Sequence, residues 1–318
     1  MKTLQSVFAG PISAYLELRR SLGYRCQNTT YFLHCFDTQA CQQNHTGPLT
    51  QDLALDFAMS NPNSSINYRA HRYRVVRLFS EYLAIYDPKT PFLDPKALPH
   101  SHARAPRHIY TDEELLRILD EARRVSPINP VRGMTFHAMI GLAASCGLRI
   151  SEVVGLDRGD VDWKTATLLI RQTKFGKSRI VPLHSTTLEV LRNYAAVRDV
   201  SFSDCKVPAF FLNSGRRRYA RNTVQRVFAG LACRTGLRGP RGRGPTFHDL
   251  RHRFAVKCLV GWYKAGIDVQ GMLPALATYM GHVHFTDTAY YITATAELLT
   301  LATVRYQHWL DEKGEGVS

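Results

Sequence analysis

The second half of the sequence carries a dispersed set of basic and aromatic residues whose types suit chemistry on a phosphodiester. The set comprises two arginines, one lysine, two histidines and one tyrosine: Arg149, Lys174, His248, Arg251, His282 and Tyr291. Nucleophilic attack adds negative charge to an already anionic phosphorus centre, so fixed positive donors must lie where that charge develops. Guanidiniums suit this task because their planar fork donates two parallel hydrogen bonds to phosphate oxygens and stays protonated. No acidic cluster accompanies the set, which predicts phosphodiester chemistry without a metal ion.

Four strings hold these residues: GLRISEVVGL, TKFGKSRIVPL, FHDLRHRFA and MGHVHFTDTAYY. Together they resemble the tyrosine recombinase (phage integrase) family over roughly residues 109 to 292. The resemblance makes Arg149 the first catalytic arginine, with Glu152 as its neighbouring acid. It makes Arg251 of the HxxR pattern the second phosphate clamp. His248, which precedes Arg251 by one helical turn, would hydrogen-bond the same phosphate or assist proton transfer.

The resemblance also assigns the proton donor and the nucleophile. It places the general-acid lysine on a β-hairpin, at Lys174, with Lys177 as the second candidate. His282 follows a glycine in the family's last motif, and Tyr291 lies nine residues later as the nucleophile. The adjacent Tyr290 is the rival nucleophile. A phenol with an ordinary pKa of about 10 needs neighbouring positive charge to favour its phenolate.

The charge of the chain predicts a polyanionic partner. The formal net charge is +15, and the segment from Arg216 to Arg253 holds eleven arginines and a single acid, Asp249. Double-stranded DNA is the natural partner for such a surface, although a solvated basic face is the plainer interpretation. The expected DNA-contacting residues are Arg69, Arg72, Arg74, Arg77, Lys177, Arg216, Arg217, Arg218, Arg241 and Arg243.

Apolar periodicity and capping residues predict helices in residues 1–93. A first helix carries Ile12, Tyr15, Leu16 and Leu22 near one face and ends around Gly23. Asp52 is the expected cap of a short second helix, and Ser64 or Ser65 the cap of a longer one. The proline- and histidine-rich segment 94–108 is typical of a linker.

Residues 109–318 form the second predicted domain. Thr111 and Glu114 have the spacing of a capping box at the start of its first helix. Two helices joined near Gly147 follow, then a three-stranded segment with a turn at residues 174–177, and helices resume from Thr186. The expected fold is mainly α. The resemblance implies a helical, SAM-like core-binding domain followed by an α+β catalytic domain with a small antiparallel sheet, the DNA breaking-rejoining enzyme fold.

Other patterns exclude several classes of protein. No apolar run approaches the roughly 20 residues that span a bilayer, and the first residues do not form a convincing signal peptide. Seven scattered cysteines without a CxxC pair indicate reduced thiols, so we expect a cytoplasmic protein. The spacing of Cys35, Cys41 and His45 matches no common zinc finger, and we expect neither a metal ion nor a cofactor.

The predicted function is site-specific DNA recombination through a 3′-phosphotyrosyl intermediate, serving a mobile element or plasmid. The resemblance implies a homotetramer on DNA, or a hetero-assembly with related recombinases. Residues 296–310 have one apolar helical face, which either folds back on its own domain or docks in a neighbouring subunit. The alternatives are a type IB topoisomerase and a non-catalytic DNA-binding regulator. A metal-dependent nuclease lacks a visible carboxylate constellation.

Overall fold

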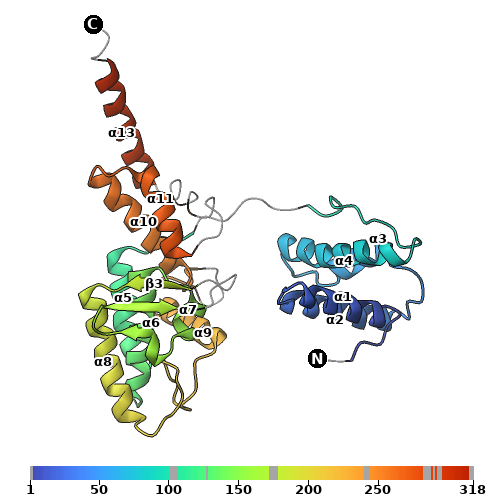
Figure 1. Cartoon of the computed structure of the whole chain (residues 1–318), viewed down its shortest axis with the longest axis horizontal. Helices are drawn as coiled ribbons and strands as arrows, with labels where there is room; N and C mark the ends of the chain where they lie inside the picture. Colours follow the sequence, from blue (N-terminus) through green and yellow to red (C-terminus); the bar gives the residue numbers. More distant parts are fainter. Residues whose placement is uncertain are drawn as a thin grey trace. The chain divides into compact units, whose positions relative to one another are not determined.

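The computed structural model describes residues 3–99, 107–126, 128–171, 178–239, 244–281, 288, 291 and 296–314 (Figure 1). The chain divides into two compact units, Met1–Ala105 and Pro106–Ser318. Among the described residues, no helix is both long and apolar enough to span a membrane. The mainly α-helical fold with a small antiparallel sheet confirms the predicted fold class.

The first unit is a bundle of four helices around one core. The helices are α1 (Ala9–Ser21), α2 (Gln27–Gln42), α3 (Gln51–Met59) and α4 (Ile66–Tyr86). Ile12, Leu33, Phe36, Phe57 and Phe79 are almost completely buried at its centre. The sequence analysis did not identify α2, whose apolar residues are interrupted by threonine, glutamine and cysteine.

The structure corrects the predicted cap of α3 and the predicted burial of Leu22, and it decides between Ser64 and Ser65 as the cap of α4. Thr50, rather than Asp52, caps α3 by accepting a hydrogen bond from the Leu53 amide at 3.3 Å. Asp52 lies in the first turn of α3, where a carboxylate favours the helix dipole without capping it. Leu22 is exposed because α1 ends one residue earlier. Ser65 caps α4 by accepting from the Tyr68 amide.

The described ends of the predicted linker pack on their own units. The main-chain oxygen of Asp94 accepts from the Tyr73 hydroxyl at 2.8 Å, and its amide donates to Gln51. Ala97 and Leu98 pack against the first core. At the other end, His108 lies 2.8 Å from Glu114. Asp94, Ala97 and Leu98, within the predicted linker, therefore have partners in the first unit.

The second unit contains the remaining helices and the sheet. Its elements are α5 (Asp112–Arg123), α6 (Pro130–Cys146), α7 (Ile150–Gly155), the 3₁₀ turn η1 (Arg158–Asp160), β1 (Val161–Asp162), β2 (Thr167–Ile170), β3 (Arg179–Pro182), α8 (Ser185–Ser201), α9 (Arg221–Arg234), α10 (Asp249–Lys264), α11 (Val269–Met280) and α13 (Ala296–Gly314). The predicted capping box of Thr111 and Glu114 is present at the start of α5. The predicted pair of helices around Gly147 is also confirmed as α6 and α7.

The sheet has the order β1-β2-β3, with both pairs antiparallel. Leu168 lies opposite Val181 and both are fully buried, while Ile170 lies opposite Arg179. This register places Arg179 at the start of β3. The predicted turn at residues 174–177 lies outside the described residues.

Two apolar clusters build this unit. The larger one joins α5 to α9 with the sheet, and the smaller one joins α10, α11 and α13 and includes Tyr291. In Figure 1, α10, α11 and α13 gather at one end of the unit, and α8 lies toward the other. The helix α10 also packs on α6, so it links the two clusters.

The C-terminal helix α13 is anchored to α10 near its start. Leu298 is completely buried, Lys264 pairs with Glu297 at 2.9 Å, and Arg305 donates to the carbonyl of Ile267. Leu299 and Tyr306, expected on the same apolar face, are exposed by 50% and 58%. The side chains of Trp309 and Leu310 lie outside the described residues. The described part of the helix is therefore only partly covered by its own domain.

Candidate active site

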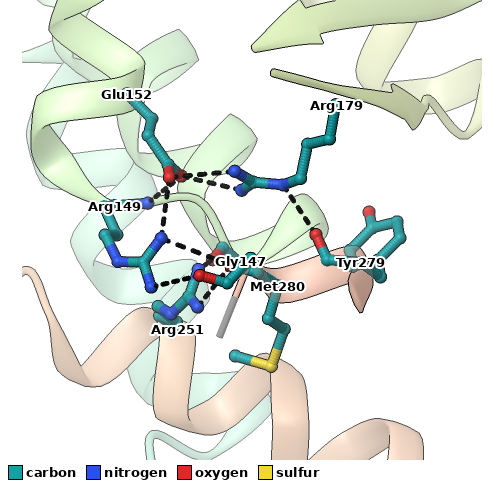
Figure 2. Close-up of polar contacts among 8 residues, drawn as sticks. Gly147, Arg149, Glu152, Arg179, Arg251, Tyr279 and Met280 are labelled. Carbon is teal, nitrogen blue, oxygen red and sulfur yellow. Dashed lines mark hydrogen bonds and ion pairs between the residues drawn. The ribbon is translucent and has the colours of Figure 1, made fainter. Parts of the chain in front are cut away.

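Four helix ends meet at one place in the second unit and supply the candidate active site. They are the C-terminal end of α6, the N-terminal ends of α7 and α10, and the C-terminal end of α11. Figure 2 shows that three arginines from separate elements, Arg149, Arg179 and Arg251, turn their guanidiniums toward the end of α11. Free carbonyls at a helix C-terminus carry partial negative charge, so this end attracts cations.

Arg251 is the most enclosed of the three arginines. Its side chain is 1% exposed, and it donates to the carbonyls of Gly147 at 2.7 Å and Met280 at 2.6 Å. Burial, reinforced by the nearby charge of Arg149, lowers the pKa of Arg251 to about 10. The guanidinium remains charged at neutral pH. It is a buried cation held by main-chain oxygens.

Arg149 reaches the same helix end from the start of α7. Its Nη1 donates to Glu152 at 2.9 Å and to the Met280 carbonyl at 3.3 Å, and its Nη2 donates to the Gly281 carbonyl at 2.9 Å. Arg149 and Arg251 therefore share the Met280 carbonyl (Figure 2). The structure brings these two predicted phosphate clamps together although they lie about a hundred residues apart in sequence.

Arg179 is a member of this network that the sequence analysis missed. Its two terminal nitrogens donate to the two carboxylate oxygens of Glu152 at 3.0 and 2.9 Å, and its Nε donates to the Tyr279 carbonyl at 2.7 Å. Burial would raise the pKa of Glu152, but hydrogen bonds and charge from Arg179 and Arg149 hold that pKa below its ordinary value. Glu152 is therefore an ionised carboxylate shared by two guanidiniums.

Two glycines in left-handed conformation make this arrangement possible. Gly147 ends α6 with φ +62°, and Gly281 ends α11 with φ +66°. A Cβ at position 147 would lie 2.5 Å from the Phe254 ring, and one at 281 would lie 3.0 Å from a nitrogen of Arg179. Only glycine fits both the backbone and the close approach.

His248, His252 and Tyr291 form an aromatic group beside the arginines. The rings of His248 and His252 meet edge to face with centroids 4.8 Å apart, and the His252 and Tyr291 centroids are 5.3 Å apart. Tyr291 is 3% exposed. Burial, together with the charge of Arg251, lowers the pKa of His248. His252 was missed, although its position four residues after His248 on one helix face is a usable signal.

Several predicted residues lie outside the described residues. They are Lys174, Lys177, Arg241, Arg243 and His282, together with the rival nucleophile Tyr290. The structure therefore places four of the six predicted catalytic residues, Arg149, His248, Arg251 and Tyr291, in one neighbourhood.

The four arginines of α4 differ in what their side chains contact. Arg72 is 8% exposed, its guanidinium lies 4.0 Å from the Phe57 ring centroid, and it donates to Ser60. Arg69 donates to Ser64 and to the Pro62 carbonyl, and Arg77 pairs with Glu81. Arg74 is exposed. Arg74 is therefore the α4 arginine best placed to meet a ligand in solution.

Acids from other parts of the chain neutralise part of the arginine-rich segment. Four of its arginines form ion pairs in the described structure: Arg216 with Asp204, Arg218 with Asp157, Arg234 with Glu121 and Arg253 with Asp112. Arg218 also donates to two carbonyls at the end of α7, and Arg217 is exposed. The excess of positive charge at this surface is smaller than the sequence alone suggests.

The described residues contain no group of three or more metal-ligating side chains. The ring nitrogen Nε2 of His45 lies 3.0 Å from the carbonyls of Gly47 and Pro48.

Comparison with known proteins gives the family. The sequence model described as "Phage integrase family" matches residues 109–297, more than half of the chain. The chain belongs to the phage integrase family of tyrosine recombinases.

Two curated relatives illustrate the range of similarity. The putative integrase/recombinase y4rE of Sinorhizobium fredii is 43% identical over 92% of this chain and 94% of its own length. The tyrosine recombinase XerD of Mycobacterium tuberculosis is 32% identical over 63% of this chain and 61% of its own.

Solved structures share the fold at low sequence identity. A XerH site-specific recombinase bound to palindromic difH substrate has a TM-score of 0.66 and 19% identity, covering 88% of this chain and 79% of that one. The Tn1549 transposon integrase in complex with transposon right-end DNA has a TM-score of 0.65 and 17% identity, covering 94% and 98%.

The two arginines Arg72 and Arg74 give a matched test of the prediction that α4 contacts DNA. We expect Arg72→Met to lower the thermal stability of the first unit, because it removes a buried cation–π contact and a hydrogen bond to Ser60. Arg74→Met should leave stability unchanged and weaken DNA binding. The slope of the logarithm of the binding constant against the logarithm of the salt concentration should become shallower by about one. Circular dichroism melting and salt-dependent gel shifts measure the two effects. A loss of DNA affinity confined to the Arg72 variant would contradict this assignment.

The lowered pKa of His248 predicts a pH dependence of stability. The folded recombinase favours the neutral ring, so the unfolded chain binds more protons between the lowered folded pKa and about 6.5. The free energy of unfolding should therefore fall as the pH drops through that window. His248→Gln removes this contribution, so the variant should gain stability relative to wild type between about pH 7.5 and about pH 5.5.

Urea unfolding followed by tryptophan fluorescence measures this difference, since all three tryptophans, Trp163, Trp262 and Trp309, belong to the second unit. Comparing variant with wild type cancels the contributions of other histidines. A difference that is independent of pH, or that shrinks in acid, would show that His248 does not titrate as expected.

Proposed function

We propose that this recombinase cuts and rejoins duplex DNA at specific sites through a covalent link between Tyr291 and a DNA 3′ phosphate. The Tyr291 hydroxyl loses its proton and its oxygen attacks the phosphorus. The bond from phosphorus to the 5′ oxygen breaks, this oxygen takes up a proton, and a 3′-phosphotyrosyl bond forms. A 5′ hydroxyl from a second strand then attacks the same phosphorus and releases the tyrosine. Each step exchanges one phosphoester bond for another, so the scheme consumes no nucleotide triphosphate.

The observation that carries this proposal is the convergence of Arg149 and Arg251 on one carbonyl oxygen, that of Met280. In a hydrogen bond from a guanidinium to a phosphate oxygen both partners are charged, whereas in one to a carbonyl only the donor is charged, so the phosphate attracts the guanidinium more strongly. A DNA phosphate that enters here would therefore compete well with the neutral carbonyls for the same N–H groups. Two guanidiniums on one phosphate would stabilise the charge that develops during attack.

The histidines and the lysine have proposed roles beside the clamps. His248 is next to Arg251 and favours its neutral form, so it can accept a proton or donate a hydrogen bond to phosphate. Lys174 as proton donor to the leaving 5′ oxygen, with Lys177 as the second candidate, and His282 as a phosphate contact remain proposals from the family motifs. Because these groups supply positive charge and proton transfer, we propose that cleavage requires no metal ion.

We propose that the first unit acts as a core DNA-binding domain, the second as the catalytic domain, and that the partner is double-stranded DNA. Support comes from the similar XerH recombinase, whose structure holds difH substrate, and from a lambda integrase tetramer on a Holliday junction with a TM-score of 0.61. We extend the proposal to a homotetramer, or a hetero-assembly with related recombinases. The Tn1549 protein is named a transposon integrase, which supports the proposal that this recombinase serves a mobile element; service to a plasmid is the other proposal.

The nucleophile can be identified with two variants of adjacent tyrosines. We expect Tyr291→Phe to bind DNA normally and to form no covalent adduct, because it lacks the attacking oxygen. Tyr290→Phe should retain cleavage. A nicked suicide substrate run on a denaturing gel, in the presence of EDTA, reports adduct formation. Adduct formed by the Tyr291 variant but not by the Tyr290 variant would reverse the assignment, and an absolute need for magnesium would contradict the metal-free scheme.

The exposed face of α13 predicts a role in assembly. Leu299 and Tyr306 expose half or more of their surface, while Leu298 anchors the helix in its own domain. We expect a chain that lacks residues 296–318 to bind a single DNA site but to lose synapsis and recombination. The double variant Leu299→Ser/Tyr306→Ser, which keeps the Leu298 anchor, should lose the same activities without unfolding.

Gel shifts measure site binding, and recombination of paired sites measures the assembled activity. A well-folded double variant or truncation that recombines at the wild-type rate would exclude a role of this face in assembly. Relaxation of a single supercoiled circle, without recombination by the full chain, would favour the topoisomerase activity instead.

A further inference from the structure

The ion-pair network around Glu152 contains more positive groups than phosphate binding by two clamps requires. Three guanidiniums, those of Arg149, Arg179 and Arg251, surround the end of α11, and the network holds one carboxylate, that of Glu152. The side chains of Arg179 and Glu152 are only 11% and 4% exposed. Charges held away from water interact strongly, so which guanidinium the carboxylate neutralises matters for the whole site.

Glu152 is bound more completely by Arg179 than by Arg149. The Arg179 guanidinium donates to both carboxylate oxygens, whereas the Arg149 guanidinium donates to Oε1 alone, at 2.9 Å. The second carboxylate oxygen, Oε2, also accepts from the Arg149 main-chain amide at 2.9 Å, a contact that uses none of the guanidinium donors. The Arg149 guanidinium also donates to the carbonyls of Met280 and Gly281, which are neutral acceptors. Of the guanidinium hydrogen bonds that Glu152 accepts from these two arginines, most therefore come from Arg179.

Removal of the Arg179 charge would change this partition. Glu152 would keep Arg149 as its cationic partner within the network, and its negative charge would then cancel that of Arg149. A carboxylate and a phosphate are both anionic acceptors that suit the planar fork of arginine, so they compete for the same donors. Arg149 would be drawn toward Glu152 and away from the substrate.

We propose that Arg179 is a positioning residue that occupies Glu152 and thereby leaves the charge of Arg149 available to the DNA phosphate. The inference rests on the proposed function, in which Arg149 is a phosphate clamp. Arg179 itself need not touch DNA in this scheme. Its bond to the Tyr279 carbonyl also fixes the start of β3 to the end of α11.

Two substitutions separate the charge of Arg179 from its hydrogen bonding. Arg179→Gln keeps polar contacts and loses the charge, and we expect it to reduce the rate of adduct formation on a nicked suicide substrate by about 10²–10³, the loss typical when one transition-state donor is withdrawn. Arg179→Lys keeps the charge and should stay within about tenfold of wild type. Site affinity should change far less in both variants, because many other basic residues contact DNA.

Charge balance gives a sharper test. The double variant Arg179→Gln/Glu152→Gln removes the competing carboxylate together with the charge that occupied it. We expect it to cleave faster than the Arg179→Gln single variant by about tenfold or more. If Arg179 contributed only packing, the double variant would cleave no faster than Arg179→Gln alone. The exposed Arg158, 3.0 Å from Asp199, provides a control for the loss of one arginine charge from an ion pair: Arg158→Gln should leave cleavage unchanged.

A neutral substrate distinguishes lost phosphate stabilisation from general damage. A methylphosphonate at the scissile position lacks the charged non-bridging oxygen that Arg149 would stabilise. Cleavage of this probe by Arg179→Gln should fall by less than about tenfold relative to wild type, although cleavage of the ordinary phosphate falls by much more. If Arg179→Gln fails to fold, the double variant carries the same comparison, since no buried carboxylate is left without its partner.

The outcomes separate this inference from the proposed function. Failure of the wild-type chain to form adduct, or adduct formation by Tyr291→Phe, overturns the proposed mechanism whatever Arg179 does. With wild-type cleavage intact, three results each overturn the role of Arg179: wild-type activity of Arg179→Gln, no gain in the double variant, or equal losses on phosphate and methylphosphonate.

Discussion

The carbonyl groups at the end of helix α11 hold the three arginines of the candidate active site together. Arg179 donates to Tyr279, Arg251 and Arg149 donate to Met280, and Arg149 donates to Gly281 as well. The last carbonyls of any helix lack partners within the helix, so they accept from whatever donors are near. Three elements far apart in the chain thus meet at one structural feature, and the position of α11 determines how the guanidiniums are arranged.

Electrostatics explains why Glu152 stabilises this cluster of guanidiniums and why the cluster would bind a further anion. Burial disfavours the charged guanidinium of Arg251, and repulsion by the neighbouring Arg149 adds to this cost, so the pKa of Arg251 is lowered to about 10. One carboxylate against three guanidiniums leaves a formal excess of two positive charges in this network. Main-chain dipoles stabilise part of that excess. A bound DNA phosphate would neutralise more of it, so the same arrangement that strains the free protein would favour the substrate and, still more, the transition state.

The sequence predicted those features of the fold and of the site whose signal is local. The capping box of Thr111 and Glu114 and the helix break at Gly147 follow from short-range preferences, and both are present. Arg179 has no such signal, because its partners Glu152 and Tyr279 lie 27 and 100 residues away. The sequence also overestimated the unpaired positive charge of the segment Arg216–Arg253. Some of its arginines pair with acids that lie far away in sequence, such as Glu121 and Asp112 of α5. Helix α2 was missed because its buried positions alternate with polar residues and its N-terminus has no side-chain cap.

The glycines in the strings CGLR and MGH have a common physical role. Each one ends a helix in the left-handed conformation, so the chain turns away and leaves the final carbonyls open to side chains. After α6, this turn brings Arg149 to the start of α7 two residues later, while the Gly147 carbonyl accepts from Arg251. After α11, the Gly281 carbonyl accepts from Arg149. A residue with a Cβ at either position would disturb both the turn and the packing against Phe254 or Arg179. The two glycines therefore connect backbone geometry directly to the placement of Arg149 and Arg251, the two proposed phosphate clamps.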